Sequence, residues 1–168
     1  MQRKFLINMS NIHSGGALQV ANSFVAELLK LKSRPFLYKI LISNEIASSF
    51  DKDELIKSDW SFEVYNTYGI QALWSQLNKI QFEFDSVFTL FGPKYTFFRA
   101  KRDIVGFAQA NILELNNPAL KKLSYIKRKK LQIKHILQTW FFKRSDYLIV
   151  ELDHVRESLE NAGIFPKK

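Results

Sequence analysis

Apolar residues along this chain fall into short runs that alternate with stretches of helical spacing. Each short run is bounded by polar, Gly or Pro residues, which is typical of a strand buried in a sheet. The predicted strands are Phe5–Ile7, Phe36–Ile42, Phe62–Tyr65, Ser86–Phe91, Asp103–Ala108 and Asp146–Val150.

The stretches between the strands carry apolar residues at intervals of three and four, the spacing of one helical face. The predicted helices are Ala17–Leu29, a short one near Asp51–Glu54, Ile70–Phe82, about 119–144, and Asp153–Ala162 closed by Gly163. Short apolar strands separated by helices indicate an α/β fold. We expect a single Rossmann-like, doubly wound, mostly parallel sheet with helices on both faces.

The turn after the first strand ends in Ser14-Gly15-Gly16-Ala17. Free N–H groups and the helix dipole make a helix N-terminus attractive to an anion, and glycine lets a ligand approach the backbone closely. Gly15, Gly16 and Ala17 are therefore a candidate anion site. The alternative is an ordinary βα turn in which glycine only relieves strain.

Ligands of doubly wound sheets bind outside the carboxyl ends of the strands. Four polar segments follow predicted strands and should lie at that edge. They are Asn8–Gly16, Asn66–Gly69, Gly92–Tyr95 and Gln109–Asn117.

The composition excludes several classes of protein and site. With 168 residues, 46% of them hydrophobic, the chain suffices for one domain, expected over 1–168. It has no cysteine for a disulfide or a thiolate metal site, which suits the cytoplasm. No apolar run reaches the roughly 18 residues of a membrane span, and no signal peptide is recognisable.

Local motifs for common enzyme classes are missing from the sequence. The Gly-Gly turn lacks the third glycine of a dinucleotide site, and the chain contains neither a phosphate loop nor a nucleophile elbow. The histidines, His13, His135 and His154, lie in separate segments without metal-ligand spacing. We therefore expect no metal and no cofactor.

The positive charge is concentrated in one segment. The chain has a net charge of +9, and all of that excess lies between Leu115 and Ser145, which holds nine basic residues and no acidic one. Such a segment points to a local anionic partner rather than a generally basic protein.

Within this basic segment, apolar residues recur at helical spacing: Ile133, Ile136, Leu137, Trp140 and Phe141. One interpretation is a helix that packs this stripe on the sheet and exposes its charge to water. The other is a surface that meets anionic lipid headgroups. Its candidate contacts are Lys127, Arg128, Lys129, Lys130 and Lys134. Nucleic acid is not expected as a partner, since no recognised binding motif accompanies the charge.

The segment Asn8–Ala17 resembles the opening of family-4-type glycosyltransferases of the GT-B fold. Three later segments are similar to the successive strands of the same family: Phe88–Pro93, Val105–Gln109 and Lys143–Val150. The resemblance therefore runs from Lys4 to about Ile164. It implies the acceptor-side half of a retaining transferase that takes a sugar from a nucleotide-sugar donor. The acceptor would be a glycan or lipid-linked precursor in bacterial surface polysaccharide biosynthesis. The C-terminal donor-binding domain is expected to be absent here, and the chain alone inactive.

The resemblance also assigns roles to individual residues. It places Gly15, Gly16 and Ala17 against the donor diphosphate. It places Asn11, His13 and Gly92 on the acceptor side, although His13 reads equally well as a polar turn residue. Gln109 and Asn111 stand where many members have a histidine that contacts the donor sugar, so this contact departs from the family pattern. The implied location is cytoplasmic, peripheral on the inner membrane face. The alternative function is a non-catalytic α/β domain that binds a nucleotide or another anionic partner.

Overall fold

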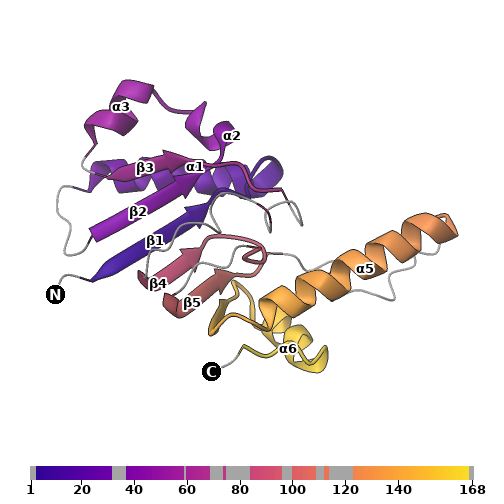
Figure 1. Ribbon diagram of the computed structural model, residues 1–168. Coiled ribbons are helices and arrows are strands. Elements are labelled where there is room, and N and C mark those ends of the chain that lie inside the picture. The colour runs from indigo at the N-terminus through magenta and orange to yellow at the C-terminus, as the bar shows by residue number, and fades with distance from the viewer. Residues whose placement is uncertain are drawn as a thin grey trace.

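The computed structural model describes residues 3–31, 37–58, 60–68, 74, 84–95, 100–108, 112–113 and 123–166. Its centre is a six-stranded sheet in the order β3-β2-β1-β4-β5-β6, and every strand pair is parallel (Figure 1). The strand order reverses between β1 and β4, which is where doubly wound sheets place their ligands. The α/β fold expected from the sequence is confirmed.

The strands agree with the predicted runs to within three residues at each end. They are β1 Lys4–Met9, β2 Leu37–Ile42, β3 Ser61–Val64, β4 Phe84–Thr89, β5 Ala100–Gly106 and β6 Tyr147–Ile149. The apolar runs located the strands because parallel strands covered on both faces are apolar along much of their length.

The helices depart further from the predictions. They are α1 Gly15–Lys30, α2 Asn44–Ala47, α3 Lys52–Lys57, α5 Tyr125–Phe142 and α6 Asp153–Asn161. The short helix expected near Asp51 is α3, and α2 was not foreseen. The expected helix Ile70–Phe82 lies outside the described residues except for Trp74.

Helix α1 begins at Gly15, two residues before the predicted start, so both glycines belong to its first turn. Its inner face packs on Ile7 and Ile40 of the sheet through Ala21, Val25 and Leu28, as the periodicity predicts. Helices α2 and α3 join the same cluster and lie on the same side of the sheet as α1 (Figure 1).

The opposite face of the sheet carries the second layer. Strand register puts Val105 of β5 on the face of Leu6, because Leu6 pairs with Val87 and Thr89 with Val105. Val105 packs with Phe142 of α5 and Leu159 of α6. Helices therefore contact both faces.

Helix α6 ends as the sequence predicts. Gly163 has φ +65° and follows the last helical turn. The N–H of Gly163 donates to the Glu160 carbonyl at 2.9 Å, and the N–H of Ile164 donates to the Leu159 carbonyl at 2.9 Å. This paired pattern is the Schellman motif, in which a left-handed glycine satisfies carbonyls at a helix end.

Candidate functional site

Two of the four segments expected at the carboxyl edge are hydrogen-bonded to each other, and one of them also bonds to Phe91, directly before a third. The N–H of Thr67, after β3, donates to the Ser10 carbonyl after β1 at 3.0 Å. The Asn11 side chain donates to the Phe91 carbonyl after β4 at 2.8 Å. These bonds join the loops after β3, β1 and β4. Of the fourth segment, only residues 112–113 are described, so Gln109 and Asn111 lie outside the described residues.

The first turn of α1 is open to solvent at this edge. Ser14 stands at the N-cap position but makes no side-chain capping bond, and no acidic residue occupies the first turn. Gly15 and Gly16 are exposed, and a Cβ built on either would meet nothing within 4 Å. The first N–H groups of a helix have no partner within it, so this turn presents donors without a competing carboxylate.

The two glycines differ in backbone conformation. Gly15 has φ +71°, in the left-handed region, whereas Gly16 does not have a positive φ. The backbone therefore favours glycine at position 15. At position 16 the backbone accommodates any L-residue, so a substitution there changes access to the turn without straining it.

His13 is held at both ring nitrogens. Its Nδ1 lies 2.8 Å from Oε2 of Glu45 in α2, and its Nε2 lies 2.9 Å from the Thr67 carbonyl. A backbone carbonyl only accepts hydrogen bonds, so Nε2 is the donor in the bond to Thr67. Tyr68 stacks on the ring at 3.8 Å between centroids and donates to the other Glu45 oxygen at 3.2 Å.

These contacts join the loop after β1, helix α2 and the loop after β3 through His13. We call His13 with Glu45, Thr67 and Tyr68 the His13 clamp. The pKa of Glu45 is lowered, chiefly by the hydrogen bond from His13, and the pKa of Tyr68 is raised by desolvation and then by Glu45. Both ring nitrogens of His13 are engaged within the protein. The structural role of His13 is therefore to hold the neighbouring loops in place at the carboxyl edge.

A buried polar chain crosses the edge beneath the clamp. The Ser10 hydroxyl donates to Asn8 Oδ1 at 2.7 Å and lies 3.0 Å from the Thr67 hydroxyl, while Asn8 Nδ2 donates to Thr89 Oγ1 at 3.4 Å. All four side chains are buried. Asn8, Ser10 and Thr67 lie in segments that the sequence places at this edge, but sequence reasoning did not single out any of the four as a buried polar residue.

Asn11 has one satisfied and one unsatisfied group. Its amide donates to Phe91, but its buried Oδ1 has no hydrogen-bond partner among the residues that the structure describes. Next to this bond lies Gly92, buried with φ +81°, whose N–H donates to the Gly106 carbonyl at 3.2 Å. Gly92 thus shapes the loop after β4 with its backbone.

Gly106, at the end of β5, was not singled out from the sequence. A Cβ there would lie 1.9 Å from the Leu90 carbonyl oxygen, so the backbones of β4 and β5 converge where only glycine fits. The end of the sheet near the reversal of strand order is therefore tightly constrained.

The base of α5 covers a second polar cluster. Tyr95 hydrogen bonds to Gln138, and its ring packs against Phe141 at 5.0 Å between centroids. Burial raises the pKa of Tyr95, against a smaller opposing effect of Gln138. His135 is buried beside this region on α5, and its Nδ1 has no hydrogen-bond partner in the described part of the chain. Burial, followed by the charge of Lys134, lowers the pKa of His135.

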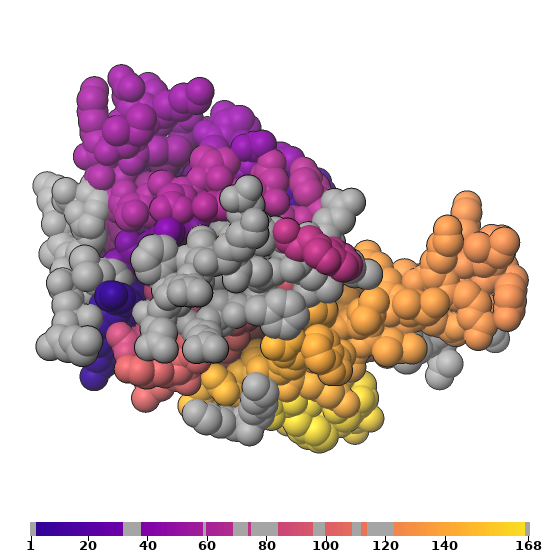
Figure 2. All heavy atoms as spheres, in the orientation of Figure 1, coloured from indigo at the N-terminus to yellow at the C-terminus, as the bar shows by residue number. Residues whose placement is uncertain are grey.

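Helix α5 overturns most of the interpretation in which its apolar stripe packs on the sheet, although Phe141 of that stripe is buried and Leu137 is partly buried. Ile133, Ile136 and Trp140 are exposed by 58%, 68% and 52%. The residues buried on α5 are His135, Gln138, Phe141 and Phe142, and of these only Phe141 belongs to the predicted stripe. Figures 1 and 2 show the helix projecting from the body of the molecule. The periodicity located the helix, but docking of its C-terminal end selected a different face.

The basic residues of α5 lie at the surface. Lys127, Lys129, Lys130 and Lys134 are exposed and Arg128 is partly exposed. Within the part of the chain that the structure describes, none of the five forms an ion pair with a carboxylate. Their charge is thus uncompensated at this surface.

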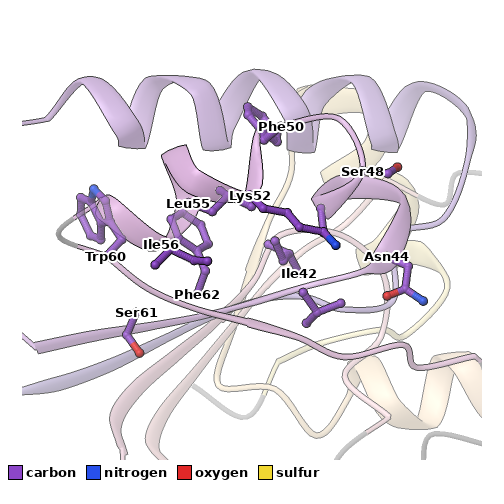
Figure 3. Close-up of a pocket in the computed structure, with 12 residues that line it drawn as sticks. Ile42, Asn44, Ser48, Phe50, Lys52, Leu55, Ile56, Trp60, Ser61 and Phe62 are labelled. Carbon is purple, nitrogen blue, oxygen red and sulfur yellow. The ribbon is translucent and has the colours of Figure 1, made fainter.

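A hollow of about 870 Å³ lies at the opposite side of the molecule, between α2–α3 and the β2–β3 edge (Figure 3). Its walls include Phe50, Leu55 and Trp60, and the Lys52 side chain extends along it toward Asn44. None of the predicted site residues lines this hollow. It is therefore separate from the open turn of α1.

Searches against known protein families, curated proteins and solved structures found no match. Among the described residues, no group of three or more potential metal-ligating side chains is present. No described helix is long and apolar enough to cross a membrane.

Proposed function

We propose that this chain is the acceptor-side domain of a retaining glycosyltransferase of the GT-B type. It works with a donor-binding domain that closes over the carboxyl edge of the sheet. The donor is a nucleotide sugar, and the acceptor is a glycan or lipid-linked precursor of a bacterial surface polysaccharide.

The observation that carries this proposal is the uncapped first turn of α1 beside the reversal of strand order. Gly15 and Gly16 leave its N–H groups accessible, and the first turn has no carboxylate to repel a phosphate. A diphosphate held by the facing domain completes its hydrogen bonding at Gly15, Gly16 and Ala17. The resemblance of Asn8–Ala17 to the transferase family supports the same placement.

Acceptor contacts are assigned to the loops that meet below this turn. The unpartnered Oδ1 of Asn11 accepts a hydrogen bond from an acceptor hydroxyl once the adjoining loops adjust. His13 is a positioning residue that holds the turn against α2 and the loop after β3. Gly92 supplies backbone shape, and Gln109 and Asn111 are proposed to face the donor sugar.

The domain is further proposed to sit peripherally on the cytoplasmic face of an anionic membrane. The support is the exposed, uncompensated charge of Lys127, Arg128, Lys129, Lys130 and Lys134. A bound position at the membrane brings the carboxyl edge toward lipid-linked acceptors.

The alternative function is a non-catalytic α/β domain that binds a nucleotide or another anion at the same turn. The open α1 N-terminus supports this function equally well, so sugar transfer must be measured directly. The 168-residue chain alone should turn over no sugar nucleotide, since donor binding is assigned to the other domain. Robust transfer by the purified chain would contradict this division of labour.

The deciding experiment uses a protein that joins this chain to its donor-binding domain. Transfer is assayed with a panel of nucleotide sugars for the parent, Gly16→Val and Gln19→Val. Gln19 is exposed on the next turn of α1, so Gln19→Val places the same valine side chain on the helix without blocking its first turn. We expect Gly16→Val to lose at least about tenfold in kcat/KM, equivalent to about 1.4 kcal/mol of transition-state stabilisation, and Gln19→Val to retain activity.

Folding is checked separately by thermal melting. Gly16 has open space around it and no positive φ, so the valine variant should melt like the parent. Full turnover by a normally folded Gly16→Val would show that the turn is scaffold. Nucleotide binding without transfer by the parent would favour the alternative function.

A further inference from the structure

Helix α5 has two opposed faces. Leu131, His135, Gln138 and Phe142, at intervals of three and four residues, form the face toward the body, where His135, Gln138 and Phe142 are buried. Turning 100° per residue places Ile126, Ile133, Ile136 and Trp140 on the other side. We call these four the exposed apolar face, and their side chains are exposed by 67%, 58%, 68% and 52%, respectively.

It is unusual for a helix at a protein surface to expose large apolar side chains along one face. Helices normally turn their apolar stripe toward the core, yet α5 buries two polar side chains and exposes three isoleucines and a tryptophan. The face extends over roughly 21 Å from Ile126 to Trp140 at 1.5 Å per residue. Several large apolar side chains exposed on one face of a helix mark an interaction surface.

The charges around the exposed apolar face indicate which partner covers it. Lys127, Lys130 and Lys134 recur at intervals of three and four along one flank, and all are exposed. Lys129 lies within the stripe, three residues after Ile126 and four before Ile133, and its ammonium is 5.9 Å from the Tyr125 ring. The segment from Leu115 to Ser145 contains no acidic residue. A partner must therefore offer apolar depth and negative charge along the whole helix.

An anionic bilayer meets both requirements. Its acyl boundary accepts the isoleucines, and its headgroups accept the lysines on the flanks. Tryptophan and tyrosine favour the interface between these layers, and Trp140 and Tyr125 stand near the two ends of the helix. Figure 2 shows α5 standing clear of the body, so a flat surface can reach it.

We infer that α5 lies in the plane of an anionic membrane with the exposed apolar face inserted among the lipids. This inference deepens the peripheral membrane association proposed above. In addition to the electrostatic contact of the lysines with headgroups, the exposed apolar face inserts among the lipids. The inference does not depend on whether the protein transfers sugars. Its failure is thus distinguishable from failure of the transferase proposal.

The test measures partitioning of the full chain onto vesicles of phosphatidylcholine with or without phosphatidylglycerol. Binding should require the anionic lipid. Ile133→Asn with Ile136→Asn should weaken it about 100-fold, roughly tenfold for each apolar side chain removed. Lys127→Gln with Lys130→Gln and Lys134→Gln should also weaken it about 100-fold, roughly fivefold for each charge.

Matched controls come from α3, on the other side of the molecule. Ile56 is exposed by 78%, and Lys52 is exposed and forms no ion pair with any carboxylate that the structure describes. Ile56→Asn and Lys52→Gln make the same chemical changes there and should leave vesicle binding unchanged. Thermal melts of all variants establish that they are folded, which is expected because the altered side chains are exposed.

Insertion depth provides an independent readout through Trp140. Lipids brominated on the acyl chain should quench the fluorescence of the parent more than that of Trp140→Phe. Normal binding by the double Ile→Asn variant, or equal quenching of parent and Trp140→Phe, would overturn insertion. Absence of vesicle binding, with self-association that the same Ile→Asn changes abolish, would also overturn it and identify a protein interface.

Discussion

Replacing Gly106 with alanine tests how closely the strands converge at the candidate site. The added Cβ would lie 1.9 Å from the Leu90 carbonyl oxygen and 3.1 Å from its carbon, so backbone and not a flexible side chain must move. The movement also disturbs the 3.2 Å hydrogen bond from the Gly92 N–H to the Gly106 carbonyl. Overpacking of this kind costs about 3 kcal/mol.

A smaller opposing effect reduces that cost. Alanine restricts the unfolded chain and returns about 0.4–1 kcal/mol where the native conformation accepts it. Gly106 does not have a positive φ, so this gain applies. The net loss should be about 2–3 kcal/mol, which corresponds to a fall in Tm of roughly 4–12 °C for a protein of this size.

Gly16→Ala is the matched control, since its Cβ meets nothing within 4 Å and the position lies in the first turn of a helix. It should raise the free energy of unfolding by about 0.5–1 kcal/mol. Urea unfolding followed by far-UV circular dichroism measures both variants. A Gly106→Ala protein as stable as the parent, with an unchanged m value, would refute the convergence of β4 and β5 at this point.

Three further predictions concern groups around the site. Burial lowers the pKa of His135 from 6.5, so stability from its neutral form is present above 6.5 and is lost as pH falls below it; His135→Gln should flatten unfolding free energy against pH in that window. The His13 bond lowers the pKa of Glu45 from 4.5, so its stabilisation is lost as pH falls below 4.5; Glu45→Gln should remove this acid sensitivity and speed amide exchange at Thr67. Trp60→Phe removes the 2.8 Å bond from Nε1 to the Leu28 carbonyl and should cost about 1–2 kcal/mol in urea unfolding.

The carboxyl edge illustrates what the sequence could and could not predict about the candidate site. Strand ends fall where apolar runs stop, so the segments containing Asn11 and Thr67 could be assigned to one edge before their contacts were known. The contacts of His13 with Glu45 and Thr67 could not be predicted, because these partners lie 32 and 54 residues from His13 in the sequence. Such pairings depend on how the loops fold over the sheet.

The sequence alone determined the α/β architecture, the approximate strands and the end of α6 at Gly163. These features follow from local rules: apolar runs for strands buried on both faces, and a left-handed glycine for a helix end. The start of α1 at Gly15 was not predicted, because Ser14, Gly15 and Gly16 are all residue types that are common in turns. Local sequence therefore did not specify which of them begins the helix.

Helix α5 shows most clearly the difference between what the sequence determines and what the tertiary structure determines. Its apolar period was visible from Ile133 to Phe141, but a period specifies only that these side chains share a broad face, of which Phe141 is buried and Ile133, Ile136 and Trp140 are exposed. Which face meets the body depends on neighbours distant in sequence, such as Phe107, whose ring packs on Phe142 at 4.9 Å between centroids. The tertiary structure therefore decided that the apolar face is exposed, because only the docked helix has an inside and an outside.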